Sequence, residues 1–129
     1  MIKYLLIFLL PTLIYSQKFY YEREFGEFNF ATNFSMSPLG ILYVTDSGNS
    51  EVYALDTLGN FLKEIGGFGW DQSQFDNPIN VYADGLRVYV TDQNNHRIQI
   101  FDRELNFLTY LRRRDSRNGA ENFGYPIAS

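Results

Sequence analysis

Two stretches of the sequence are close copies of each other. The first, YVTDSGNSEVYALD, covers residues 43–56, and the second, YVTDQNNHRIQIFD, covers residues 89–102. They align without a gap at an offset of 46 residues, and the match continues through the NFL triplets at 60–62 and 106–108. A fixed period in the forties indicates an array of one repeated supersecondary unit. This period constrains the fold more than any other feature of the chain.

Each repeated unit is predicted to contain four short strands. In the second copy we expect them at residues 79–83, 87–91, 97–101 and 107–111, separated by polar turns. The first turn contains Asp84-Gly85, a dipeptide well suited to a tight hairpin. No segment after the first sixteen residues shows the apolar spacing of a helix. The sequence therefore predicts an all-β fold.

The central strands of each unit are apolar at nearly every position, as in ILYV at 41–44 and VYAL at 52–55. A strand with one solvated face would alternate, so these strands must be covered on both faces. Sheets of four antiparallel strands that recur at this period and stack face to face are the blades of a β-propeller. We predict blades at about residues 28–74 and 75–122 and the start of a third at 123–129.

The two ends of the chain contain parts of further units. NFGYPI at 122–127 repeats QFDNPI at 74–79, and residues 17–27 read as a fourth strand followed by a connector. We hypothesise that this N-terminal strand completes the last blade of the full propeller, because an unpaired edge is a liability. Two blades alone would leave apolar faces exposed. We therefore expect a fragment of a longer protein, with self-association of several chains as the alternative.

The first sixteen residues, MIKYLLIFLLPTLIYS, differ from the rest of the chain. A basic start at Lys3, an apolar run and a small residue at Ser16 form the pattern of a secretory signal peptide. The run is interrupted by Pro11 and is too short to anchor the chain across a hydrocarbon core of about 30 Å. We predict cleavage after Ser16, no stable membrane insertion afterwards, and a secreted or periplasmic protein.

Composition limits both how the exported chain is stabilised and which partners it binds. There is no cysteine, so burial and not disulfide bonding must stabilise it. Without Lys3 the 11 basic residues fall to 10, against 15 acidic ones, which gives a net charge of −5. This charge disfavours nucleic acid and anionic membranes as partners.

The second unit resembles the NHL repeat, which belongs to a family of β-propellers. The residues that carry the resemblance are Asp92, Asn95, His96, Arg97 and Ile98. The first unit departs from this pattern, because Ser50 and Glu51 stand where the second unit has His96 and Arg97. The resemblance covers about residues 28–129 and implies a propeller that closes with about six blades.

Aspartate and asparagine recur in the turn that follows the second strand of each unit. They are Asp46 and Asn49 in the first unit and Asp92 and Asn95 in the second. We interpret them as structural, because such side chains routinely bond the backbone N–H groups of their own turn. The alternative is a ring of carboxylates around a channel.

The same turn of the second unit also holds a cation and an imidazole. Arg97 is expected to reach a carboxylate such as Asp92, because a buried unpaired charge is costly. His96 is the only histidine, so the chain offers no second imidazole for a metal centre. No metal site is predicted from these residues.

Two connectors contain candidate binding residues. A locally basic run follows the second unit and consists of Arg112, Arg113 and Arg114. It is either a solvated loop or a contact for an anion or an acidic glycan. Trp70, the only tryptophan, lies in the connector after the first unit. If exposed it would be a binding anchor, and if packed on Phe68 or Phe75 it would belong to the core.

Two functions follow from these observations. The leading hypothesis is an exported, non-catalytic scaffold without a cofactor, whose connector loops contact a protein or a glycan. The rival, which the resemblance implies, is a propeller hydrolase or lyase with calcium or zinc in its central channel. A metal there needs ligands on the innermost strands, where this sequence offers Asn33, Asn80 and Tyr82.

The signal peptide gives a direct test of export. When the chain is expressed with its own N-terminus in a secreting host, we expect the exported product to begin at Gln17, because the small residue before it fits a cleavage site. N-terminal sequencing or intact mass measurement checks this. An exported product that retains Met1 would contradict the prediction.

Overall fold

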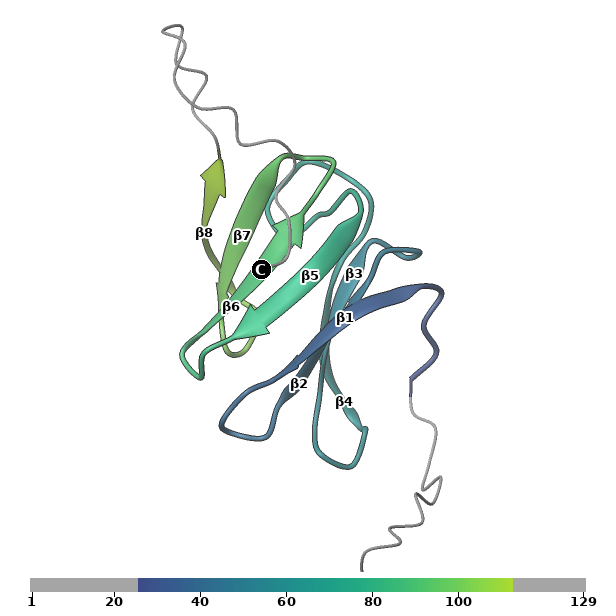
Figure 1. Ribbon diagram of the computed structural model, residues 1–129, viewed down its shortest axis with the longest axis vertical. Helices are drawn as coiled ribbons and strands as arrows, with labels where there is room; N and C mark the ends of the chain where they lie inside the picture. Colours follow the sequence, from purple (N-terminus) through teal and green to yellow (C-terminus); the bar gives the residue numbers. More distant parts are fainter. Residues whose placement is uncertain (1–25, 113–129) are drawn as a thin grey trace, which may run out of the picture.

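The structure, a computed structural model, describes residues 26–112. In this range eight strands form two four-stranded antiparallel sheets, and the described residues contain no helix (Figure 1). The first sheet consists of β1 (Ala31–Met36), β2 (Leu42–Asp46), β3 (Glu51–Leu55) and β4 (Phe61–Gly66). The second consists of β5 (Pro78–Ala83), β6 (Arg87–Asp92), β7 (Arg97–Asp102) and β8 (Phe107–Arg112).

The strands of each sheet are paired in chain order. The expected all-β fold of four-stranded antiparallel units is therefore confirmed, and each strand expected in the second unit is found within one residue at either end. The signal peptide at 1–16, residues 17–25 of the N-terminal strand, the end of the second unit and the third unit at 123–129 lie outside the described residues.

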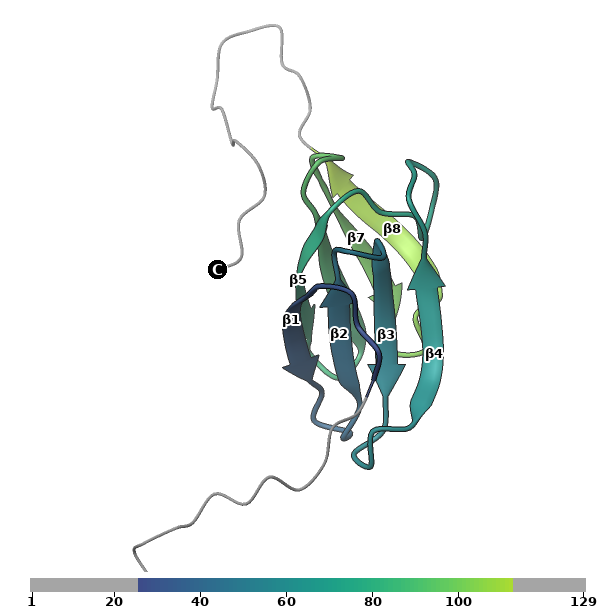
Figure 2. The ribbon, with the colours of Figure 1, turned by 90° about the vertical axis from the view of Figure 1, so that its right-hand side faces the viewer.

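The two sheets share one hydrophobic core, which lies between them. β5 contacts both β1 and β2, and Figure 2 shows the sheets stacked face to face. The buried residues of this core are Tyr43, Val52, Ala54, Phe75, Val81, Ala83, Val88, Val90, Phe101 and Leu105. Burying one large apolar side chain stabilises a fold by about 1.5–3 kcal/mol. The contact between the sheets is thus a main source of stability.

The outer faces of the two sheets are also apolar. On the first sheet, Val44, Tyr53 and Leu55 are buried, and Phe28 packs against Tyr53 with its ring centroid 5.3 Å away. On the second sheet, Tyr82 and Leu111 lie on the outer face and are each 59 % exposed. Both faces of each sheet are therefore apolar, as expected. In a propeller, neighbouring blades cover such faces.

The period of the repeat changes by one residue within the first hairpin. Met36 pairs with Leu42 in the first sheet, and Ala83 pairs with Val88 in the second, so the first turn holds one residue more. As a result, Ala83 follows its counterpart Met36 by 47 residues, whereas Val88 follows Leu42 by 46. The first strands of the two units therefore align at a different offset from the other three.

A buried tyrosine links the two sheets by a hydrogen bond. The hydroxyl of Tyr43, on β2, donates to the backbone carbonyl of Arg103 in the turn between β7 and β8, at 2.5 Å. The ring of Tyr43 has no exposed surface, and burial, followed by the nearby charges of Glu104 and Asp102, raises the pKa of this hydroxyl to about 12. The bond therefore joins the turn between β7 and β8 of the second sheet to β2, an inner strand of the first sheet.

Replacing this tyrosine tests the link. Tyr43→Phe is expected to lower the free energy of unfolding by about 1 kcal/mol or more, because the carbonyl of Arg103 loses its buried donor. Tyr89→Phe is the matched control: Tyr89 is the repeat counterpart, and its hydroxyl makes only a 3.4 Å contact with exposed Asp84. Urea unfolding of both variants gives the comparison. Equal losses would contradict a specific role for Tyr43.

Candidate functional site

The connector from the first sheet to the second, Gly66–Asn77, is folded back on itself. Gly66 and Gly67 have φ angles of 137° and 99°, and a Cβ at Gly66 would collide with the carbonyl oxygen of Ser50. The N–H of Phe75 donates to the carbonyl of Gly67 at 3.0 Å, and the Phe75 ring is fully buried in the core. The connector is therefore anchored at both ends.

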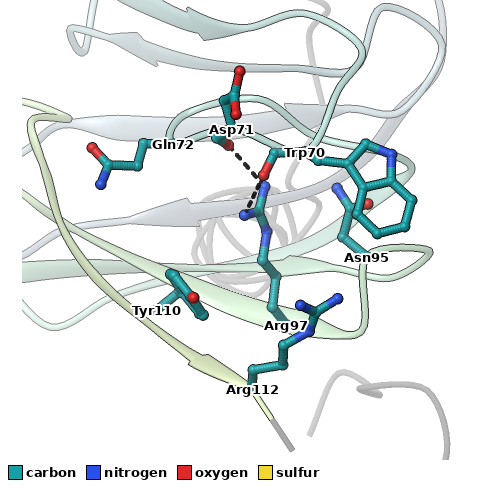
Figure 3. Close-up of a pocket in the computed structure, with 7 residues that line it drawn as sticks. All are labelled: Trp70, Asp71, Gln72, Asn95, Arg97, Tyr110 and Arg112. Atoms are coloured by element: carbon teal, nitrogen blue, oxygen red, sulfur yellow. Dashed lines mark hydrogen bonds between the residues drawn. The ribbon is translucent and has the colours of Figure 1, made fainter.

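Arg97 holds the middle of this connector. Its Nε lies 2.8 Å from Oδ2 of Asp92, which neutralises the charge, as expected from the sequence. Its Nη1 donates to the carbonyl of Trp70 at 2.8 Å, and its Nη2 donates to the carbonyl of Asp71 at 2.9 Å (Figure 3). Nη2 also donates to the carbonyl of Gln74 at 2.9 Å. The Arg97 side chain is 8 % exposed and that of Asp92 is not exposed. A single buried guanidinium thus donates to three carbonyls of the connector.

Two neutral side chains complete this clamp. Gln99 donates from Nε2 to the carbonyl of Gln74 at 2.7 Å and accepts the N–H of Ser73 at 3.0 Å. Asn95 donates from Nδ2 to the carbonyl of Gly69 at 2.9 Å and to Asp92 at 2.9 Å. Nearly every residue from 69 to 74 is therefore held by the second sheet. The role of Gln99 was not predicted, although a polar residue inside an apolar strand is the signal that marks it.

The turn aspartates bond the chain that enters their own sheets. Asp46 accepts the N–H groups of Asn29 and Phe30 at 2.7 and 2.8 Å, and it accepts the amide of Asn49 at 3.1 Å. Asp92 likewise accepts the N–H of Asp76 at 2.8 Å. Both carboxylates are fully buried, so neither is presented to solvent.

The first unit lacks the arginine clamp. Glu51 and Tyr53 occupy the positions of Arg97 and Gln99, and the Tyr53 hydroxyl donates to the Glu51 carboxylate. Burial and then this hydrogen bond raise the pKa of Tyr53 to about 12. The side chains at this position thus bond each other, whereas in the second unit they bond the preceding connector. The clamp is therefore formed by the second unit, which follows Trp70 in the chain.

A hollow of about 210 Å³ opens beside the clamp. It is lined by Trp70, Asp71, Gln72, Asn95, Arg97, Tyr110 and Arg112 (Figure 3). Trp70 is 66 % exposed, so the alternative that placed it in the core, packed on Phe68 or Phe75, is wrong. Arg112, at the end of β8, is exposed on the rim. Arg112 was expected in a connector, but β8 extends to include it. The structure brings it together with Trp70 of the connector between the sheets, while Arg113 and Arg114 lie outside the described residues.

Tyr110 forms the opposite wall of the hollow. Its ring centroid lies 5.8 Å from the guanidinium carbon of Arg97, which is within the range of a cation–π contact. Across residues 26–112, no three histidine, aspartate or glutamate side chains gather into a group that could hold a metal ion. The same residues include no helix long and apolar enough to cross a membrane. Asn33 lies on β1, and Asn80 and Tyr82 lie on the adjacent β5.

Comparison with known proteins supports the repeat assignment. The model of the NHL repeat family matches residues 75–101, which contain β5, β6 and most of β7. The resemblance seen in the second unit is therefore confirmed. A search of curated proteins found no match.

Solved structures show the same fold at low sequence identity. A predicted exported protein from Bacteroides fragilis matches with a TM-score of 0.58 and 17% identity, over 71% of this chain and 27% of that one. Hydrazine synthase from Kuenenia stuttgartiensis matches at 0.56 and 13%, over 74% and 26%. Apo AztD from Citrobacter koseri matches at 0.51 and 16%, over 64% and 23%. The chain spans about a quarter of the length of these structures, and its two sheets are blades of the β-propeller type.

Two ion pairs with the same N–O distance can be compared to test how much Arg97 contributes to the stability of the fold. Arg97→Ala is expected to lower the free energy of unfolding by about 3–5 kcal/mol, because it leaves buried Asp92 without its partner. Arg103→Ala breaks a pair with Glu104, also at 2.8 Å, whose side chains are 51% and 59% exposed. That variant is expected to lose less than about 1 kcal/mol. Urea unfolding measures both, and losses of similar size would contradict a structural role specific to Arg97.

Proposed function

Because the chain carries an NHL repeat within blades of the β-propeller type, we propose that it is part of an exported, non-catalytic scaffold. In this proposal the connector side of the blades binds a protein or a glycan. One propeller fold serves many functions, so the proposal depends on the site and not on the fold. The observation that carries it is the exposure of Trp70 on a connector whose backbone is held by Arg97.

A fixed backbone under an exposed aromatic ring favours binding. The carbonyls of Trp70 and Asp71 are both tied to Arg97, so little backbone freedom is lost when a ligand contacts the ring. Tryptophan, tyrosine and arginine are the residues most enriched among those that dominate binding energy. Trp70, Tyr110 and Arg112 all line the hollow.

Two observations support the exported part of the proposal. The first sixteen residues have the composition of a signal peptide. One of the structural matches is itself a predicted exported protein. The surplus of acidic residues favours partners other than nucleic acid.

A binding screen with matched variants tests the scaffold. The full chain is applied to arrays of glycans and peptides, and the dissociation constant of each hit is measured by biolayer interferometry. Trp70→Ala and Arg112→Ala are each expected to weaken binding by about tenfold or more, because such anchors dominate binding energy. Arg103→Ala, an exposed arginine in the turn between β7 and β8, is the control and is expected to bind as the unchanged chain does.

The outcome that contradicts the scaffold is equally specific. Arrays on which the folded chain binds nothing, or hits that both variants bind as tightly as the control, would remove the connector side as a binding surface. A circular dichroism spectrum of each variant confirms that the sheets are intact before the comparison is made.

A further inference from the structure

Three side chains of the hollow differ chemically and lie on one side of Arg97. Figure 3 draws Trp70, Asn95 and the guanidinium of Arg112 on the same side of Arg97, with Tyr110 and Gln72 on the other. They offer an aromatic surface, an amide and a cation. Some of the hydrogen-bonding and charged groups of these side chains have no partner among the described residues, and these groups indicate what the hollow binds.

The amide of Asn95 has a buried oxygen without a donor. Asn95 is 1 % exposed, and its Oδ1 has no hydrogen-bond partner among the described residues. The orientation of the amide is fixed, because Nδ2 faces two acceptors, the carbonyl of Gly69 and the carboxylate of Asp92. An unpaired buried acceptor is destabilising, so its presence beside a hollow favours a donor supplied by a ligand.

Arg112 is a cation whose charge the described residues leave uncompensated. It lies directly opposite Arg97 in the register of β7 and β8. Like charges in this position repel each other. Arg97 is neutralised by Asp92, but no ion pair forms at Arg112 within residues 26–112. Asp71, the acidic residue that lines the hollow, is drawn pointing away from Arg112 in Figure 3. An anion at Arg112 would relieve this imbalance.

We propose that the hollow binds an acidic sugar residue, a hexuronic acid within a glycan. Its carboxylate pairs with Arg112, the C–H face of its ring stacks on the indole of Trp70, and one of its hydroxyls donates to Oδ1 of Asn95. This assignment rests on the binding scaffold proposed above and names its ligand class. A peptide made only of acidic residues supplies the carboxylate but no ring that carries a hydroxyl beside it, whereas a hexuronic acid supplies all three groups in one residue.

In this proposal the indole of Trp70 moves when the ligand enters. Oδ1 of Asn95 has almost no accessible surface, and the indole drawn beside it in Figure 3 is the exposed side chain of this part of the hollow. A hydroxyl reaches the oxygen when the indole turns aside and then packs on the sugar ring. Trp70 is the only tryptophan of the chain, so its fluorescence reports this movement without interference.

The experiment is a fluorescence titration of the full chain with three probes: trigalacturonate, the neutral trisaccharide galactotriose, and the acidic peptide triglutamate. Trigalacturonate is expected to shift the emission of Trp70 and to saturate. Galactotriose is expected to bind at least about tenfold more weakly, since it lacks the carboxylate that forms a charged hydrogen bond.

Matched arginine variants locate the carboxylate. Arg112→Gln is expected to weaken trigalacturonate binding by about tenfold or more, and Arg103→Gln is expected to leave it unchanged. Both residues are exposed, so both variants are expected to fold, which circular dichroism checks.

Each contrary outcome has a distinct meaning. No response to trigalacturonate, or an equal response in Arg112→Gln, overturns the acidic-sugar assignment. A response to triglutamate alone overturns the assignment but leaves the scaffold standing with a peptide ligand. If none of the three probes gives a response, the acidic-sugar assignment is overturned but the scaffold is not. The scaffold is overturned by the array outcomes described above.

Discussion

The structure depends on covering sheets that are apolar on both faces. The inner strands β2, β3, β6 and β7 bury residues on both sides, so burial of either face stabilises each sheet. The shared core between the sheets provides this burial for one face of each. Residues far apart in sequence, such as Tyr43 and Arg103, are joined as a consequence. Stacking is therefore what converts a repeated sequence into a folded unit.

Stacking also creates the site. A connector that passes from one sheet to the next buries backbone carbonyls, and each of these needs a donor. Arg97 supplies three such donors from a single side chain, and its own charge requires the buried carboxylate of Asp92. With its backbone fixed in this way, Trp70 can project its ring outward. The stability of the fold and the candidate binding surface thus depend on the same contacts.

Much of this arrangement was predictable from the sequence, and the remainder was not for physical reasons. The strands and the Arg97–Asp92 pair follow from the period and from the cost of a buried charge. The longer first hairpin was missed because the repeat is recognisable only from the second strand onward. The exposure of Trp70 could not be decided, since a connector has no periodicity. That Trp70 and Arg112 line the same hollow could not be predicted either, because the position of Arg112 depends on the pairing register of β8.

The account requires that the two sheets stabilise each other through their shared core, and native-state hydrogen exchange of the full chain tests this most directly. The amides of β2 and β3 and those of β6 and β7 are predicted to open with the same free energy, because neither sheet keeps a covered face once the other unfolds. If the amides of one sheet exchanged through a separate, much lower opening free energy while those of the other stayed protected, the sheets would be independent and the account would be contradicted.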